Sequence, residues 1–376
     1  MAQVQRVQIP GGELSWTVVG GDHSVIVPAE EYLEYARQTG LRRNTVRSYA
    51  QGLAEWWSFL ENVERGWDRV SIADVVEFIG RLRAPDRRRG SLSDGSVQVR
   101  VRAVTSCYRY HAALGRPTLV VETSTSRGGY VPFLGHLRRQ PQFLAAVVVR
   151  RRRTIAPVLT PAQIQELLEA EAVTIDGDWT GDVRYRLLWA LLADTGMRIG
   201  EALGLQHRDW AAGRGGTAAV TIADRSNPHG VAAKSGPRVV HVGSRLDRLY
   251  SDYVWWLCDR GADQEIEDWN SSYVFCNISR GQRWAPLRPE SIYAHLAVVK
   301  RRAPLVPSEM TPHWFRHTHA TALLLTGTPV HVVSRRLGHK DVQTTLNTYG
   351  HVTEDAELAA LANWAEFSEG WWGADD

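Results

Sequence analysis

The chain has 376 residues, of which 44% are hydrophobic and 23% are charged, a composition typical of a folded protein with more than one core. Its longest apolar runs, at 143–149 and 187–193, are too short to cross a bilayer, and its N-terminus has no apolar signal region, so we expect a cytoplasmic protein with no membrane contact. Three cysteines, Cys107, Cys258 and Cys276, are too few and too scattered for a disulfide framework or a cysteine-based zinc site.

The net charge of +3 conceals a strong asymmetry between the two halves of the chain. Residues 1–153 contain 23 arginines and no lysine against 14 acidic residues, a net charge of +9, whereas residues 154–376 carry a net charge of −6. A block this basic predicts a polyanionic partner such as nucleic acid, and arginine suits bidentate contacts to phosphate. A genome that encodes arginine wherever lysine would serve is the alternative explanation.

Only three lysines accompany this large number of arginines: Lys234, Lys300 and Lys340. Lysine can give up a proton at a tuned pKa, which arginine cannot do at any working pH. A lysine kept in such a chain therefore hints at proton transfer.

The N-terminal part reads as a short extension followed by a helical domain. Residues 1–28 form the extension, in which weak alternation predicts one or two short strands. Residues 29–125 contain four expected helices, at 29–40, 44–63, 71–83 and 93–115, with Asn44 and Ser71 as expected N-caps. We expect an all-α domain that binds DNA, with candidate contacts at Arg100, Arg102 and Arg109.

A basic segment over residues 126–153 separates this domain from the next. It ends in four consecutive arginines, Arg150, Arg151, Arg152 and Arg153. We interpret the run as a strap laid along a phosphate backbone, with a solvated linker as the alternative.

The second domain is expected over residues 154–353. Thr160, Pro161 and Gln163 have the pattern of a helix start with a capping box, and a helix over 182–196 ends at Gly196. Runs at 217–224 and 237–243 predict a β-hairpin, after which helices dominate. The fold class is therefore mainly α with a small antiparallel β element. A tail over 354–376 contains seven acidic residues and no basic one.

Polar residues gather at the ends of these expected elements. Arg198 and Glu201 follow the Gly196 stop, Lys234 lies in the hairpin loop, and Thr311 is the expected N-cap of a helix with His313 and Arg316 in its first turns. The remaining candidates come after a further glycine stop: His339 and Tyr349.

Each of these residues alone has an ordinary structural explanation. An Arg-x-x-Glu pair on a helix is usually an ion pair, a loop lysine is usually solvated, and a tyrosine on an amphipathic helix is usually core. His313 and His317 have the spacing of a zinc pair, but no third ligand stands nearby and no HExxH occurs, so we expect no metal. Only the joint occurrence of these residues predicts a site.

Three segments carry a resemblance: "TGMRIGEALGL", "HWFRHTHAT" and "LGHKDVQTTLNTYGH". They resemble, in order and spacing over roughly residues 155–355, the three signature boxes of the tyrosine recombinases, the phage-integrase family. The helical domain resembles the family's SAM-like core-binding domain. One departure is the strand "VVHV", where the family often has a Val-Pro-Leu-like sequence, which makes the lysine the weakest match.

The resemblance implies a role for each matching residue. Tyr349 would be the nucleophile, Arg198 and Arg316 would clamp the scissile phosphate, and Glu201 would brace Arg198. Lys234 would protonate the leaving oxygen, His313 would accept the tyrosine proton, and His339 would bond to the phosphate. His317 and His319 would have structural or supporting parts.

The implied activity is that of an integrase- or transposase-type recombinase, associated with the bacterial nucleoid. It would cut and rejoin duplex DNA at specific sites through a 3′-phosphotyrosine and a Holliday junction, without metal, cofactor or ATP. A homo-tetramer on DNA would be the working assembly, with exchange of the C-terminal tail between protomers; a tail helix folded onto its own domain is the alternative. The alternatives are a type IB topoisomerase-like relaxing enzyme and a non-cleaving DNA-binding regulator of the same fold.

Overall fold

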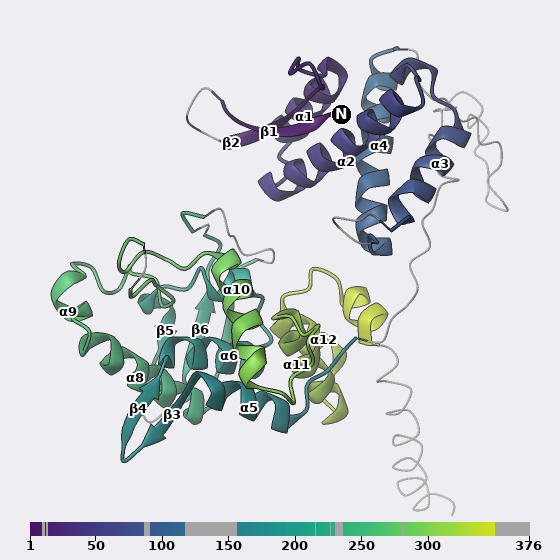
Figure 1. Cartoon of the computed structure of the whole chain (residues 1–376). Helices are drawn as coiled ribbons and strands as arrows, with labels where there is room; N and C mark the ends of the chain where they lie inside the picture. Colours follow the sequence, from purple (N-terminus) through teal and green to yellow (C-terminus); the bar gives the residue numbers. More distant parts are fainter. Residues whose placement is uncertain are drawn as a thin grey trace, which may run out of the picture. The chain divides into compact units, whose positions relative to one another are not determined.

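The computed structural model describes residues 1–9, 12, 14–85, 91–116, 156–214, 216–225, 227–229, 236–279 and 281–349. The chain divides into two compact units, Met1–Arg153 and Thr154–Asp376 (Figure 1). Both units are mainly helical with small antiparallel sheets, which confirms the expected fold class.

The first unit is a helical domain preceded by a β-hairpin. Its elements are β1 (Gln3–Gln8), β2 (Leu14–Val19), α1 (Val27–Gln38), α2 (Arg43–Asn62), a 3-10 turn (Trp67–Arg69), α3 (Ile72–Arg83) and α4 (Asp94–Ala113). The hairpin pairs Gln3 with Val19 and packs against α2, whose buried Trp56 contacts the rings of Phe59, Phe78 and Tyr108. These aromatic contacts form the centre of the first core.

The starts of the helices in this unit follow the sequence with one exception. Ser71 caps α3 as expected, because its hydroxyl accepts from the Asp74 amide while Asp74 accepts from the Ser71 amide. Asn44 was wrong as a cap, since α2 begins at Arg43 with Arg42 in the N-cap position. The Arg42 carbonyl already accepts from the amides of Thr45 and Val46, so Asn44 lies inside the first turn.

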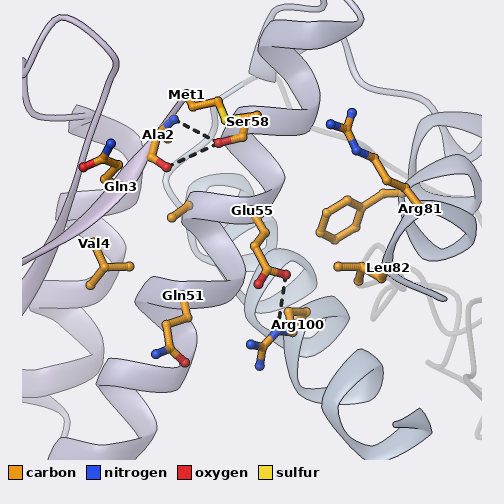
Figure 2. A pocket seen from close by; sticks show the side chains of 12 residues that line it. Met1, Ala2, Gln3, Val4, Gln51, Glu55, Ser58, Arg81, Leu82 and Arg100 are labelled. Carbon is orange, nitrogen blue, oxygen red and sulfur yellow. Dashed lines mark hydrogen bonds and ion pairs between the residues drawn. The ribbon is translucent and has the colours of Figure 1, made fainter. Parts of the chain in front are cut away.

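A pocket of about 540 Å³ lies between the start of β1 and helices α2, α3 and α4 (Figure 2). Its lining includes the ion pair between Arg100 and Glu55, with 3.3 Å between Nε and Oε2. The Ala2 amide donates to the Ser58 hydroxyl at 2.9 Å on the opposite side. The hairpin is thus attached to α2 by a hydrogen bond from its backbone as well as by apolar contacts.

The second unit places one buried helix at its centre. In chain order its elements are α5 (Pro161–Glu171), β3 (Ala172–Ile175), β4 (Asp178–Gly181), α6 (Val183–Thr195), α7 (Ile199–Ala202), a 3-10 turn (His207–Asp209), β5 (Trp210–Ala211), β6 (Ala219–Ile222), β7 (Arg238–His241), α8 (Ser244–Cys258), α9 (Ala262–Glu265), α10 (Pro289–Val299), a 3-10 turn (Lys300–Arg302), α11 (His313–Leu325), α12 (Val330–Leu337) and a helical segment over 342–349. Helix α6 contacts α5, α8 and α11, and most of its residues are buried (Figure 1). This explains why its sequence is apolar all round.

The sheets of this unit are small. The expected hairpin forms the β6–β7 part of an antiparallel sheet of order β5-β6-β7, in which Ala219 faces His241. The β3–β4 hairpin was missed in the sequence, although its turn residues Asp176 and Gly177 both have positive φ and Asp-Gly is a strong hairpin signal.

Two hydrophobic clusters stabilise this unit. The larger one is built around α6 and the sheet. The smaller one joins α11, α12 and the 342–349 segment, and its buried members are Ala156, Ala320, Leu324, Val333, Leu337 and Tyr349. Within the described parts of the chain, no helix is both long and apolar enough to cross a membrane.

Candidate active site

Arg198 and Glu201 lie at the start of α7, directly after α6 ends at Gly196 in the left-handed region, with φ of +62°. The Arg198 amide donates to Glu201 Oε2 at 2.9 Å, and its Nη1 donates to Oε1 at 3.0 Å. The Glu201 carboxylate is fully buried, whereas a quarter of the Arg198 side chain is exposed. The carboxylate therefore holds a guanidinium whose outer side can meet a ligand.

A second arginine, Arg238, binds the same carboxylate. As the first residue of β7 it donates from Nη2 to Glu201 Oε2 at 2.8 Å and from Nη1 to Oε1 at 3.2 Å. Its Nε donates to the Arg336 carbonyl at 2.9 Å, near the end of α12. Sequence reasoning missed Arg238, because one more arginine does not stand out in this chain and its partner is 37 residues away.

Arg316 is the most deeply buried cation of the site, with 2% of its surface exposed. Its Nη1 donates to the Gly196 carbonyl at 2.9 Å and its Nη2 to the Leu337 carbonyl at 2.7 Å. Burial, followed by the charge of nearby Arg198, lowers the pKa of Arg316 to about 9. Helix α11 thus presents Arg316 to the junction between α6 and α7 and to the C-terminus of α12.

His339 follows Gly338, which ends α12 in the left-handed region with φ of +67°. Its Nδ1 lies 2.7 Å from the Thr345 hydroxyl. Burial, and then the charges of Arg316, Arg198 and Arg238, lower the pKa of His339 to about 4. The imidazole is therefore neutral above about pH 5 and lies within the field of the three arginines.

Tyr349 ends the described chain in the helical segment over 342–349, and only 1% of its surface is exposed. Its hydroxyl lies 2.9 Å from Nδ1 of His317 on α11. Burial raises the pKa of Tyr349 to about 12, although the charges of Arg316 and Arg198 act in the opposite direction. The Tyr349 phenol is therefore fully protonated at neutral pH, and it lies within the electrostatic influence of Arg198 and Arg316.

The histidines of α11 occupy three different environments. His313 is the exposed first residue of the helix, and its ring meets that of His317 edge to face at 4.5 Å. His319 is held by the Ala193 carbonyl at its Nδ1 and by Arg336 Nε at its Nε2. The phenol of Tyr349 meets the second of these histidines, His317, for which the sequence predicted only a supporting part.

Helix α11 begins slightly later than expected. The expected N-cap at Thr311 was one residue early, because the N-cap position belongs to Pro312.

Some candidates fall outside the described residues or outside this cluster. Lys234 and Arg150, Arg151, Arg152 and Arg153 are not among the described residues. Arg102 and Arg109 are exposed on α4, whereas Arg100 is partly buried in its ion pair with Glu55. No group of three or more His, Cys, Asp or Glu side chains is placed to hold a metal ion in the parts of the chain that the structure describes.

The segments that flank Lys234 are anchored to the site and to its neighbours. Before it, Arg225 forms an ion pair with Asp209, and His229 Nε2 lies 2.9 Å from the Pro286 carbonyl. After it comes Arg238 with its contacts to Glu201. Both ends of the hairpin loop are therefore fixed to buried partners.

Comparison with known proteins identifies the family to which the chain is related. Residues 157–356 match the phage integrase family, and residues 29–115 match the phage integrase N-terminal SAM-like domain. Transposase A from transposon Tn554 of Staphylococcus aureus is 25% identical over 94% of this chain and 95% of its own length. Tyrosine recombinase XerD of Mycobacterium tuberculosis is 30% identical over 84% of this chain and 89% of its own length.

Solved structures share the fold. The Tn1549 transposon integrase in complex with transposon right end DNA superposes with a TM-score of 0.60 at 22% identity, covering 89% of this chain and 98% of that one. The XerH site-specific recombinase bound to its palindromic difH substrate superposes with a TM-score of 0.58 at 19% identity, covering 88% and 82%. The chain belongs to the phage integrase family and is a tyrosine recombinase, an enzyme of the DNA strand-transferase class.

Proposed function

We propose that this protein is a site-specific recombinase of the integrase or transposase type, which cuts and rejoins DNA through a covalent 3′-phosphotyrosine on Tyr349. The observation that carries the proposal is that Arg198 and Arg316 act electrostatically on both His339 and a buried tyrosine of the same chain, whose hydroxyl contacts His317. Two structural relatives, XerH bound to the difH substrate and the Tn1549 integrase in complex with transposon right end DNA, support DNA as the partner.

The chemistry follows from the charges. Attack on a phosphodiester builds negative charge on its non-bridging oxygens, and fixed guanidiniums stabilise that charge without reorganisation. Arg198 and Arg316 supply such groups, and the neutral His339 adds a hydrogen-bond donor beside them. The phosphotyrosine conserves the energy of the broken bond, so that strands can be rejoined without ATP.

Three further assignments complete the proposal. Lys234 protonates the leaving 5′-oxygen, since a lysine can give up a proton and both flanks of its loop are anchored near Glu201 and Asp209. Arg102, Arg109 and the run Arg150, Arg151, Arg152 and Arg153 contact the phosphate backbone, while Arg100 contributes through its pair with Glu55. A homo-tetramer, with exchange of the tail over 354–376, joins two sites through a Holliday junction.

A covalent-capture experiment tests the proposal. The full-length protein is incubated with a pool of nicked duplexes that carry a randomised window, and DNA that stays attached under denaturing conditions is sequenced. We expect adducts on a defined sequence, linked at Tyr349, with none formed by Tyr349→Phe. Binding without adducts would point to a regulator, and relaxation of supercoiled plasmid without joining of two captured sites would point to a topoisomerase-like enzyme.

A further inference from the structure

The contact between His317 and Tyr349 supports an inference that rests on the proposed function and concerns the first chemical step. We propose that His317 is a catalytic residue that accepts the phenolic proton as Tyr349 attacks the phosphate. The resemblance suggested His313 for this part, but the ring next to the hydroxyl is that of His317, with 2.9 Å between Nδ1 and the oxygen.

The geometry is suited to proton transfer. A general base must lie within about 2.6–3.2 Å of the atom that loses the proton, and His317 Nδ1 meets this condition before any DNA is bound. The rings of His317 and Tyr349 also meet edge to face, with 5.7 Å between their centroids. The His317 ring also meets that of the exposed His313, which offers the proton a way towards solvent.

The charged surroundings keep His317 in the form that can accept a proton. Burial, and then the charge of Arg316, lower the pKa of His317 below its usual value of 6.5, so the imidazole is neutral at pH 7. The titratable groups around it are His313 and Arg316 on α11 and Tyr349 on the 342–349 segment. Arg336 on α12 bonds to His319 instead, and the charge that faces it from α6 is that of Asp194.

The proposed step forms one bond to phosphorus, breaks another and transfers two protons. The Tyr349 oxygen forms a bond to phosphorus while the bond from phosphorus to the 5′-oxygen breaks. The phenolic proton moves to His317 Nδ1, and the 5′-oxygen takes a proton from the general acid, which is Lys234 in the proposed function. In the rejoining step the 5′-hydroxyl attacks phosphorus and gives its proton back to Lys234, while the bond from phosphorus to Tyr349 breaks and His317 returns its proton to the phenolate oxygen.

The test measures the rate of adduct formation between pH 6 and 9 on the duplex selected by covalent capture. We expect the wild-type rate to be nearly independent of pH above pH 6.5. His317→Ala should be slower by about 10²-fold or more at pH 7, and its rate should rise about tenfold per pH unit, because the reaction then depends on the small phenolate fraction. A variant whose rate is lower by one constant factor at every pH would overturn the proposal, because it would indicate positioning only.

Two controls separate the possible outcomes. His317→Asn keeps a hydrogen-bonding group beside the hydroxyl but cannot accept the proton, so it should share the slope of His317→Ala; a wild-type profile would contradict the inference. A 5′-phosphorothiolate duplex, whose sulfur leaves without a proton, should leave the His317→Ala defect in place, and full rescue would assign His317 to the leaving group. Failure of the wild-type protein to form any adduct would refute the proposed function itself.

Discussion

Arg238 and Glu201 are joined by two hydrogen bonds, of 2.8 and 3.2 Å, between the first residue of β7 and the short helix α7. Because Glu201 also holds Arg198, one buried carboxylate fixes two guanidiniums. Arg238 further donates to the Arg336 carbonyl, so the sheet, α7 and the end of α12 are fastened at one point.

Replacing Arg238 by Ala should lower the free energy of unfolding by about 2–3 kcal/mol, because it removes charged hydrogen bonds from a buried carboxylate. Adduct formation should fall as well, since the Glu201 carboxylate that holds Arg198 loses one of its two arginine partners. Denaturant unfolding and covalent capture measure the two effects. Arg245→Ala, an exposed arginine on α8, is the matched control with an expected change under about 0.5 kcal/mol. Equal stability of the two variants would contradict the prediction.

Replacing Gly196 by Ala should destabilise the protein by about 2–4 kcal/mol. Gly196 has a φ of +62°, and an added Cβ would lie 2.8 Å from Leu337 and 2.9 Å from His319. The backbone movement that makes room for the added Cβ would also displace the Gly196 carbonyl, which accepts a hydrogen bond from Arg316. Gly204→Ala is the control, since its Cβ would make only ordinary contacts at 3.5 Å. Thermal unfolding of the two variants checks the difference, and similar melting temperatures would speak against it.

His319 should make the second unit sensitive to acid. Its Nε2 accepts from Arg336, which requires the neutral ring, and burial followed by the charge of Arg336 lowers its pKa to about 4. The unfolded chain binds a proton near pH 6.5, so stability is lost as the pH falls from 6.5 towards 4, by at most about 3 kcal/mol from this group.

His319→Gln keeps an acceptor beside Arg336 but does not titrate. Its free energy of unfolding should therefore fall less steeply than that of the wild type over this interval, measured by urea unfolding at several pH values. His207, whose pKa burial also lowers to about 4, contributes the same trend in both proteins. Parallel curves for variant and wild type would exclude His319 as a source of the acid sensitivity.

An oxyanion should stabilise the protein in the absence of DNA. Arg198, Arg238 and Arg316 lie around a single carboxylate, and the charge of Arg198 already lowers the pKa of Arg316, so a bound anion would relieve their repulsion. Sulfate at ten times its dissociation constant should add about 1.4 kcal/mol. Calorimetry in sulfate against sodium chloride of equal ionic strength measures this, and Arg198→Ala should lose the difference. An equal response to both salts would contradict the prediction.

Local sequence signals predicted much of this fold. The glycine stops at Gly196 and Gly338, the N-cap at Ser71 and the capping box at Thr160 all have the expected geometry, because these features depend on a few neighbouring residues. The β3–β4 hairpin was overlooked although its Asp-Gly turn is also local.

The site required information that a single sequence does not contain. The three boxes indicated which residues belong together, but not which of them touch. The contacts of Arg238 with Glu201 and of His317 with Tyr349 join residues 37 and 32 positions apart through packing of separate elements. No spacing rule predicts such pairs, and so His317 was assigned only a supporting part.

The small cluster that surrounds Tyr349 has a consequence for the dynamics of the enzyme. Among the residues that the structure describes, the tyrosine packs with five other buried side chains, those of Ala156 and of α11 and α12, in a cluster separate from the large core around α6. A segment anchored by so few apolar contacts opens at a lower free energy than the helices of that core. Tyr349 can therefore leave this cluster while the rest of the domain stays folded, so local unfolding alone is enough to withdraw its hydroxyl from Arg198 and Arg316.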